Sequence, residues 1–275
     1  MTITAVVVQA RMASSRLPGK VLMDLGGKTV LSHVIERCLA ISNSSVVCCA
    51  VSDRADCEPV AEEAERCGAI VFRGSDHDVL ERYYMAAVDL KADAILRVTS
   101  DCPLIDPEVA ANLIDLFCST GADFATNNMP PLWPHGLDCE AISLKWLERA
   151  WKEAVDPMDR EHVSPFIRRH PDARIVNLRG PGGQFSDHRW TLDYPEDIEF
   201  FRALFARLPR EPHIACMKKI LSILSNQPEI SDINGMHYKA RNSEGRLDVE
   251  QSGQLDHIRN KPFFIGTASW LSPLC

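Results

Sequence analysis

Apolar residues follow two different spacings in the first half of the chain. Short runs rich in Val, Ile and Cys, with little polar alternation, predict strands that are buried on both faces. Longer segments between them repeat apolar residues every three or four positions, which predicts helices with one buried side. The strands are expected at residues 2–9, 45–51, 69–73 and 94–99, with a fifth ending by residue 126. The helices are expected at residues 29–40, 55–67, 75–90, capped by Ser75 or Asp76, and 107–119.

This regular alternation predicts an α/β fold, with a mostly parallel sheet flanked by helices on both faces. Residues 127–135, which contain three prolines, interrupt the pattern and predict a loop. The second half of the chain is less regular. It predicts strands at residues 140–142, 174–178 and 189–192, and helices at residues 144–155, 160–170, 195–208 and 214–225.

Pro209 and Pro212 mark a boundary near the end of this pattern. We therefore expect one domain over residues 1–210, in which residues 127–188 form a central insertion. Residues 211–275 are expected to form a helix and a tail that pack on this domain or are partly disordered. Within them, residues 227–253 are too poor in periodic apolar positions to form a domain alone.

Composition excludes several classes of protein. Of the 275 residues, 45% are hydrophobic and 25% charged, and the formal net charge is -8. The acidic balance argues against broad nucleic-acid binding, which needs a basic surface. No apolar run reaches the roughly 20 residues of a membrane-spanning helix, so no membrane partner is expected. Ten cysteines without a C-x-x-C pair, and a first segment without a secretory signal, predict a cytoplasmic protein with free thiols.

The loop after the first predicted strand concentrates positive charge. Arg11, Arg16 and Lys20 lie together with two serines and Gly19 within ten residues. Backbone N–H groups of such a turn, surrounded by Arg and Lys, suit a polyphosphate. The segment matches neither the dinucleotide-binding fingerprint nor the P-loop motif. A solvated basic loop is the alternative.

Two carboxylates follow predicted strands at the same edge of the sheet. Asp101 comes after the strand at residues 94–99, and Asp193 comes after the strand at residues 189–192. Ligands of open parallel sheets bind at the carboxyl ends of the strands, and Mg²⁺ prefers one or two carboxylates plus substrate phosphates. The pair is therefore a candidate Mg²⁺ site, with a turn or cap residue as the alternative for each. Asp106, directly before a proline, is expected to cap a helix rather than to bind a metal.

Five segments of the chain carry a resemblance to one group of enzymes. They are residues 9–20, 72–83, 101–106, 135–140 and 188–197. The first resembles the N-terminal signature of the cytidylyltransferases that make CMP-activated acidic sugars. The set as a whole is more similar to the spore coat polysaccharide biosynthesis protein F family. The resemblance implies the nucleotide-diphospho-sugar transferase fold, which is Rossmann-like and agrees with the predicted sheet.

The resemblance also implies roles for individual residues. The metal ligands would be Asp101 and Asp193, and these would act with Lys20 as the catalytic residues. The nucleotide-binding residues would be Gln9, Ala10, Arg11, Ser14, Arg16, Lys20, Arg73, Asp78 and Thr99, with Arg11, Ser14, Arg16 and Lys20 at the triphosphate. The sugar-binding residues would be Gly136, Asp138, Glu140, His162 and Arg189. A structural turn is the alternative for the loop at residues 136–140, and a surface histidine is the alternative for His162. His188, next to Arg189, could approach a phosphate, with a polar edge residue as its alternative.

The activity that this resemblance implies is Mg²⁺-dependent nucleotidyl transfer. An NMP group would pass from a nucleoside triphosphate, with CTP favoured, to a sugar for polysaccharide or surface glycan synthesis, and pyrophosphate would leave. One departure leaves the base open, because Thr99 stands where the octulosonate enzymes carry Gln. The resemblance further implies a homodimer formed through the central insertion.

Two other functions are open on the sequence alone. A glycosyltransferase of the same fold would use a nucleotide-sugar donor, although the segment Asp101-Cys102-Pro103 lacks the second Asp of a D-x-D pair. A non-catalytic nucleotide-binding subunit is the other alternative, but every expected charged position is filled. A Ser-His-Asp hydrolase is excluded because no G-x-S-x-G motif is present.

Overall fold

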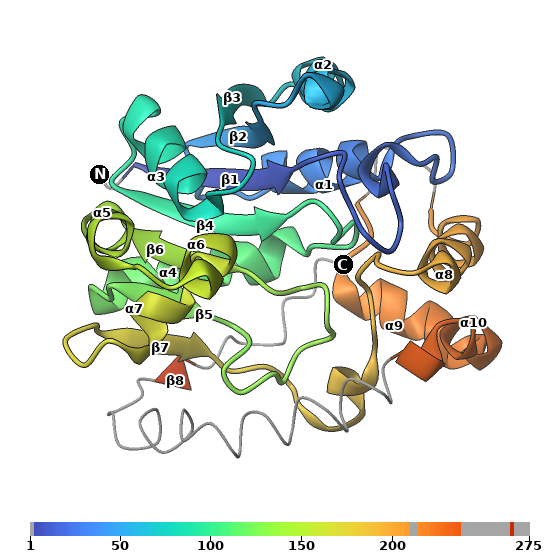
Figure 1. Cartoon of the computed structure of the whole chain (residues 1–275). Coiled ribbons are helices and arrows are strands. Elements are labelled where there is room, and N and C mark those ends of the chain that lie inside the picture. The colour runs from blue at the N-terminus through green and yellow to red at the C-terminus, as the bar shows by residue number, and fades with distance from the viewer. Residues whose placement is uncertain (1–2, 210–213, 238–264, 267–275) are drawn as a thin grey trace.

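The computed structural model describes residues 3–209, 214–237 and 265–266. Its strands pair into one sheet (Figure 1). The sheet has the order β3-β2-β1-β4-β6-β5-β7-β8. All pairs are parallel except those of β6, which runs antiparallel to both β4 and β5. The predicted α/β fold with a mostly parallel sheet is thus confirmed. The strands are β1 (Thr4–Ala10), β2 (Val46–Ser52), β3 (Ile70–Gly74), β4 (Ala94–Thr99), β5 (Phe124–Thr126), β6 (Glu140–Ser143), β7 (Ile175–Leu178) and β8 (Ile265–Gly266).

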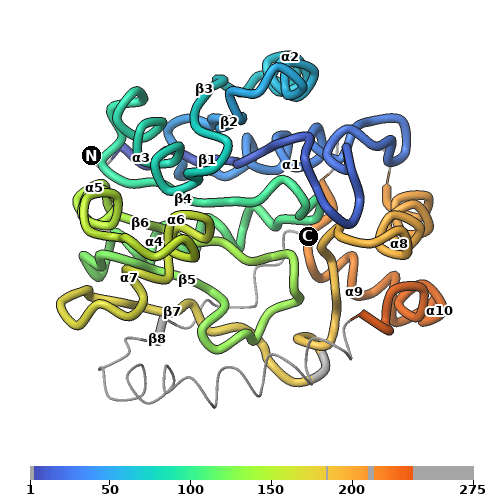
Figure 2. Tube along the Cα trace, viewed as in Figure 1, coloured from blue at the N-terminus to red at the C-terminus, as the bar shows by residue number. Residues whose placement is uncertain are grey.

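Helices cover both faces of the sheet, as the trace in Figure 2 shows. One buried cluster joins Val6 and Val8 of β1 to α1, α2, α4, α8 and α9, and a second joins Ala5 and Val7 of β1 to α3, α5 and α7. Alternate residues of one strand therefore serve two cores, which explains the absence of polar alternation in its sequence. The helices are α1 (Val30–Leu39), α2 (Glu58–Arg66), α3 (Val79–Asp89), α4 (Pro107–Thr120), α5 (Leu144–Glu153), α6 (Pro157–His162), α7 (Pro165–Arg169), α8 (Pro195–Phe205), α9 (Met217–Asn226) and α10 (Pro228–Asp232). Short 3₁₀ turns are η1 (Lys20–Leu22), η2 (Ala55–Cys57) and η3 (Gly183–Asp187).

Side-chain caps set where several helices begin. Asp106 caps α4, as predicted, by accepting hydrogen bonds from the N–H groups of Glu108 and Val109. The predicted cap of α3 is wrong, because Asp78 caps the helix, two to three residues after the predicted caps. Ser75 instead accepts the N–H of Asp78 at 3.1 Å in the preceding turn, and Asp76 accepts the hydroxyl of Ser52 at 2.7 Å.

The single helix predicted over residues 160–170 is wrong. The structure has two short helices, α6 and α7, separated at Val163, whose φ of 70° is unusual for a β-branched residue. The N–H of Ser164 donates to the carbonyl of His162 at 2.8 Å across this tight turn. Pro165 explains the break, because it lacks an N–H and its ring would clash inside a continuous helix.

The strand predicted at residues 189–192 is also wrong. The N–H of Trp190 donates to the carbonyl of His135 at 2.6 Å, whereas the N–H of Leu192 donates to the carbonyl of Asp101 at 2.8 Å. The segment is extended, but its backbone pairs with two different loops rather than with one strand. It therefore links the central insertion to the loop after β4.

The C-terminal helices pack on the core. Ile220 and Leu224 of α9 are buried in the larger cluster, and the N–H of Met217 donates to Asp106 at 2.7 Å. The short helix α10 lies in a stretch that the sequence predicted to be too polar to fold alone, and Ile230 anchors it. The predictions for residues 238–264 and 267–275 lie outside the described residues. Among the residues described, every helix is too short or too polar to cross a lipid bilayer.

Candidate active site

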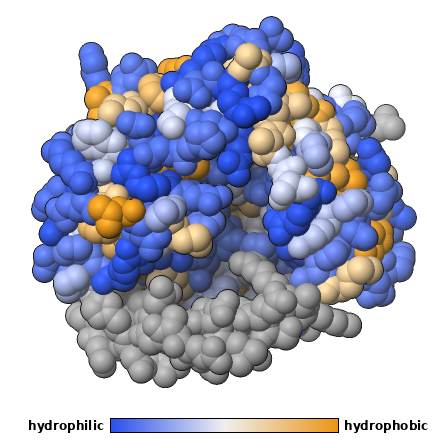
Figure 3. Space-filling model, in the orientation of Figure 1, coloured by the Kyte–Doolittle hydropathy of each residue, from blue (hydrophilic) through white to orange (hydrophobic). Residues whose placement is uncertain are grey.

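Three segments that are far apart in the sequence meet at the carboxyl edge of the sheet. They are the loop after β1, the turn after β4 and the turn before α8. Figure 3 shows a hollow near the middle of the face seen in Figure 1, between the strand ends and the C-terminal helices, with hydrophilic residues around it. The charged residues predicted for catalysis come from these three segments.

Lys20 joins the two predicted metal ligands. Its Nζ donates to Asp101 Oδ2 at 2.9 Å, to Asp193 Oδ1 at 3.1 Å and to the carbonyl oxygen of Leu192 at 2.6 Å. The side chains of Lys20, Asp101 and Asp193 are 13%, 24% and 16% exposed. The structure therefore brings together the three residues on which the predicted chemistry depends.

The charges of this cluster reinforce one another. Burial disfavours the ammonium form of Lys20, but Asp101 and Asp193 outweigh this effect and raise the pKa of Lys20. Burial likewise favours the neutral form of each carboxyl group, and Lys20 outweighs it in both cases. The pKa of Asp101 is lowered, and that of Asp193 is lowered to about 2 with further help from Arg16 and Arg189. All three groups are thus charged at neutral pH.

Asp193 has two more basic neighbours. The Nη2 of Arg16 donates to Asp193 Oδ1 at 2.9 Å, and its Nη1 donates to the hydroxyl of Tyr194 at 3.2 Å. The Nη2 of Arg189 donates to the other oxygen, Asp193 Oδ2, at 2.9 Å and also to Asp197. Arg16 is half-exposed, with 52% of its side chain accessible, whereas the side chain of Arg189 is 5% exposed. Arg16 is therefore placed for a ligand, and Arg189 supports a carboxylate.

The donor set fits a hard divalent cation. Two carboxylates already share one cationic group, the ammonium of Lys20, and Mg²⁺ prefers such a pair together with substrate phosphates. Within residues 3–209, 214–237 and 265–266, no group of three His, Cys, Asp or Glu side chains converges as a metal site. A metal held by Asp101 and Asp193 would therefore complete its coordination with water or with oxygen atoms of the substrate.

The remaining predicted nucleotide residues divide into two sets. Gln9 and Thr99 are register partners on β1 and β4, so they lie side by side at the strand ends, and Gln9 Oε1 is buried without a hydrogen-bond partner in the part of the chain described. Arg11 is exposed, Ser14 is half-buried in the same loop, and Ala10 is buried as the last residue of β1. By contrast, Arg73 pairs with Glu58 at 2.6 Å. Asp78 caps α3 and accepts the Nε of Arg160 at 2.9 Å, so both Arg73 and Asp78 are bound to other parts of the fold.

The predicted sugar-facing residues are held by structural contacts. Gly136 has φ of 111°, and a Cβ there would lie 2.1 Å from the carbonyl oxygen of Trp190, so only glycine fits. Asp138 accepts the N–H of Gly136 at 3.1 Å. Glu140 is buried and bonded to the arginines at positions 97 and 168, and His162 is exposed at the end of α6. These contacts show how the residues are positioned, and their role toward a sugar stays a prediction.

Sequence reasoning missed the residues that hold Asp193 in place. Asp197 is completely buried and binds Arg189 through both of its oxygens, and Asn234 donates to Asp197 at 2.9 Å. Asp197 lies inside the motif that the sequence singled out, where it reads as an acidic residue of the first helical turn. No feature of the sequence pointed to Asn234, because it lies in the stretch predicted to be too polar to fold alone.

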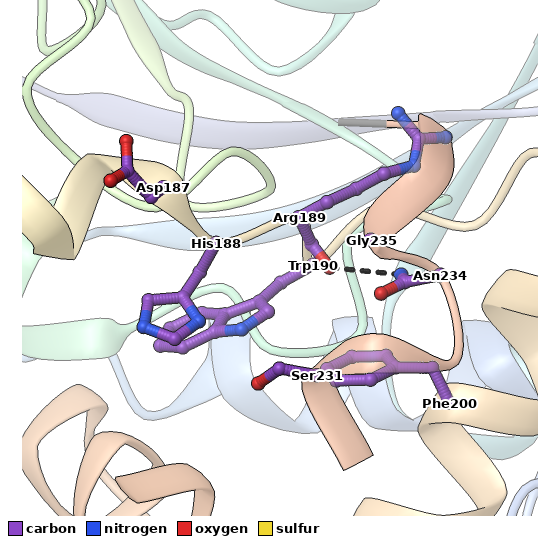
Figure 4. Close-up of a pocket in the computed structure, with 8 residues that line it drawn as sticks. All are labelled: Asp187, His188, Arg189, Trp190, Phe200, Ser231, Asn234 and Gly235. Atoms are coloured by element: carbon purple, nitrogen blue, oxygen red, sulfur yellow. Dashed lines mark hydrogen bonds between the residues drawn. The ribbon is translucent and has the colours of Figure 1, made fainter. Parts of the chain in front are cut away.

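A small pocket borders this group but is not the site itself. It is lined by residues that include His188, Trp190 and Phe200 (Figure 4). The guanidinium of Arg189 points away from these side chains, and its contacts are with Asp193 and Asp197. The pocket is thus distinct from the contacts that the Arg189 guanidinium makes with Asp193 and Asp197.

Comparison with known proteins decides the family. A family profile described as cytidylyltransferase matches residues 5–221, which is most of the chain. The chain belongs to the cytidylyltransferase family. Cytidylyltransferases are nucleotidyltransferases, so the chain is an enzyme of that class and the two other functions left open by the sequence are set aside.

Two curated relatives of this cytidylyltransferase cover most of its length. An uncharacterized protein of Methanocaldococcus jannaschii is 29% identical over 83% of this chain and 93% of the relative. The spore coat polysaccharide biosynthesis protein SpsF of Bacillus subtilis is 30% identical over 81% of this chain and 94% of the relative. These matches confirm the resemblance found in the sequence.

Solved cytidylyltransferase structures agree with the fold. One from Leptospira borgpetersenii has a TM-score of 0.78 at 28% identity and covers 84% of this chain and 97% of its own. A CMP-2-keto-3-deoxy-manno-octonic acid synthetase in complex with CTP has a TM-score of 0.59 at 20% identity, and covers 75% of this chain and 99% of its own. At that identity the second match shows the fold alone, and it confirms the predicted architecture.

Proposed function

We propose that this cytidylyltransferase transfers CMP from CTP to a sugar used in a surface polysaccharide and releases pyrophosphate. The observation that carries the proposal is the contact of one ammonium group, that of Lys20, with both Asp101 and Asp193. The relatives support it by their names, since SpsF of Bacillus subtilis is named for spore coat polysaccharide biosynthesis and the synthetase structure was solved with CTP.

Asp101 and Asp193 are the residues that would hold Mg²⁺. When bound, the metal supplies positive charge close to the phosphates and stabilises the charge that builds up during transfer. The lowered pKa values of both aspartates keep them ionised, and therefore able to bind a cation, across the physiological pH range.

The basic residues of the N-terminal loop would bind the triphosphate. Arg16 and Lys20 both contact Asp193, and Arg11 lies exposed in the same loop. As a sugar hydroxyl attacks the α-phosphorus, its proton passes to solvent, the bond from that phosphorus to the bridging oxygen breaks, and negative charge moves onto pyrophosphate. Arg11, Arg16 and Lys20 are placed to stabilise this charge. Positioning and electrostatics supply most of the acceleration in phosphoryl transfer, so no protein base is required.

CTP is favoured by family membership rather than by a base contact. Thr99 takes the place of the Gln found in the octulosonate enzymes, and its hydroxyl lies 3.3 Å from the Sγ of Cys102. The unpartnered Oε1 of Gln9 on the neighbouring strand is the acceptor nearest in register to this position.

The proposed homodimer rests on the resemblance and is supported by the exposure of Val155 and Met158 in the central insertion.

A thermal-shift screen of the four common nucleoside triphosphates with Mg²⁺ tests the nucleotide. A ligand that binds the native state at about 100 times its Kd stabilises that state by about 2.7 kcal/mol. We expect CTP to raise the melting temperature most. Equal shifts for all four triphosphates, or none for any, would contradict the proposed nucleotide.

Product analysis tests the reaction. The enzyme, CTP and Mg²⁺ are incubated with a panel of neutral and acidic sugars, and pyrophosphate is measured together with the nucleotide-sugar formed. We expect pyrophosphate release that depends on one of the sugars. Release of a nucleoside diphosphate from a nucleotide-sugar donor would indicate glycosyl transfer instead.

A further inference from the structure

We propose that Asn234 and Asp197 are positioning residues for the metal ligand Asp193, so that the segment after the family's matched region completes the active site. The inference rests on the proposed function, because it concerns the orientation of a carboxylate in the same site. The cytidylyltransferase profile ends at residue 221, and Asn234 lies thirteen residues beyond it.

Asp197 fixes the backbone at Asp193. Its Oδ2 accepts the N–H of Asp193 at 2.8 Å and the N–H of Tyr194 at 2.9 Å. The residue is 0% exposed, and the Nε and Nη2 of Arg189 bind its two oxygens at 2.9 Å each. Asp197 therefore has no oxygen left for a metal, and its carboxylate serves to organise the turn that carries Asp193.

Arg189 connects Asp197 to the side chain of Asp193. Its Nη2 bridges Asp197 Oδ2 and Asp193 Oδ2, with both distances 2.9 Å. One oxygen of Asp193 is thus held by a buried guanidinium, and the other, Oδ1, faces Lys20 and Arg16. The arrangement selects which oxygen of Asp193 is directed to the substrate side.

Asn234 completes the group from the C-terminal segment. Its Nδ2 donates to Asp197 Oδ1 at 2.9 Å and to the carbonyl oxygen of Arg189 at 3.1 Å, the second contact being drawn in Figure 4. Only 2% of Asn234 is exposed. The Asn234 amide therefore binds the carboxylate of Asp197 and the main chain of Arg189, the two residues that hold Asp193. Loss of this amide would remove one contact from each of them.

A second contact from the same segment reaches the other side of the turn. The ring of His237 stacks on that of Tyr194, with centroids 4.0 Å apart and planes at 5°, and its Nε2 lies 3.0 Å from Glu196. The hydroxyl of Tyr194 accepts a hydrogen bond from Arg16. Asn234 and His237 thus approach the Asp193 turn from one short stretch of chain.

Metal binding to the Asn234→Ala variant tests the proposal. Binding of Mn²⁺ to the full chain is followed by electron paramagnetic resonance, without turnover, and the Mg²⁺ dependence of pyrophosphate release is measured separately. Loss of a residue that orients a metal ligand costs about 10- to 100-fold in metal affinity. We expect a weakening of about tenfold for Mn²⁺, with a parallel rise in the Mg²⁺ concentration needed for half-maximal activity. The matched control is Asn226→Ala, at the exposed end of α9, which should bind Mn²⁺ as the parent does.

The other outcomes are equally informative. A variant with a lower melting temperature and unchanged Mn²⁺ affinity would show a purely structural role and overturn the proposal. Should Asn234→Ala fail to fold, the milder Asn234→Ser is measured instead, because its hydroxyl is too short to keep both contacts of the Asn234 amide; unchanged Mn²⁺ binding by this variant overturns the proposal. Failure of the proposed function is distinguishable, because the parent would then bind Mn²⁺ no better than Asp101→Asn does.

Discussion

One lysine neutralises two aspartates in the candidate active site, and this shared contact has energetic consequences. Lys20 bonds to Asp101 and Asp193 within 3.1 Å, so the two carboxylates lie close enough to repel one another without a cation between them. A divalent metal held by Asp101 and Asp193 would supply the positive charge that Lys20 provides in this structure. The Lys20 ammonium would then be available to bind a phosphate.

Asp101→Asn should lower turnover by at least about a hundredfold while the protein stays folded. The amide keeps the shape of the side chain but removes one preorganised charge, and such losses cost about 10²–10³ in kcat. Pyrophosphate release gives the rate and circular dichroism the fold. The matched control is Asp172→Asn, since Asp172 is 70% exposed and precedes β7 at the opposite edge of the sheet. Full activity of Asp101→Asn would remove this residue from the mechanism.

Lys20→Met should lower stability in the absence of metal and increase the stabilisation by Mg²⁺. Removing one partner of a buried ion pair costs about 3–5 kcal/mol, and we expect about 2 kcal/mol here because Asp101 and Asp193 are partly exposed. Millimolar Mg²⁺ should then recover more of the melting temperature in the variant than it adds to the parent. An equal Mg²⁺ shift in both proteins would mean that Lys20 and the metal do not compete for one position.

The convergence of Lys20 and Asp101 was predictable because β1 and β4 are parallel and end at one edge of the sheet, whereas Asp193 joins them from a segment that was wrongly predicted to be a strand. The contacts of Arg189 were not predictable. Its guanidinium was predicted to bind sugar, but in the structure it binds two carboxylates from a turn in which Asp193 and Asp197 lie four and eight residues ahead. Such a contact depends on a turn that local sequence does not specify.

Among the elements, those with strong periodicity were predicted well and those shaped by distant contacts were not. β4 and the start of α4 agree with the prediction because buried β-branched residues and a Pro after an Asp cap act locally. The extended segment at residues 189–192 reads as a strand, yet its partners are the loops at His135 and Asp101. Local composition cannot distinguish an extended segment between two loops from a strand in a ladder.

The junction of α4 and α9 yields a prediction about stability. Asp106 caps α4 through Oδ1 and binds the N–H of Met217, at the start of α9, through Oδ2. Loss of a cap costs about 1 kcal/mol, and a buried N–H without a partner costs about 1–3 kcal/mol. Asp106→Ala should therefore lower the free energy of unfolding by about 2–4 kcal/mol in urea denaturation. Ser143→Ala, which removes only the cap of α5, should cost about 1 kcal/mol; equal losses would show that the contact with α9 contributes nothing.

Across the whole molecule, the active site depends on segments separated by more than two hundred residues. The turn before α8 carries Asp193; Arg16 of the loop after β1 contacts Asp193 itself, and Asn234 contacts Asp197, which holds the turn. The carboxylates at this junction keep their charge because cations surround them, and so the stability of the fold is linked to their ionisation.

The ionisation of Asp193 predicts how the free energy of unfolding changes as the pH falls. The pKa of Asp193 is about 2 in the folded protein, and an Asp in the unfolded chain has a pKa of about 3.9. Because the folded value is the lower one, the stabilisation is fully present above about pH 4 and is lost as the pH falls through about 2. Between pH 7 and pH 3 this one group should account for a loss of about 1 kcal/mol in the free energy of unfolding. Asp193→Asn should therefore lose about 1 kcal/mol less than the parent over that range. If Asp193→Asn and the parent lose the same amount, Asp193 is not held ionised by Lys20, Arg16 and Arg189, and the electrostatic basis of the proposed site is wrong.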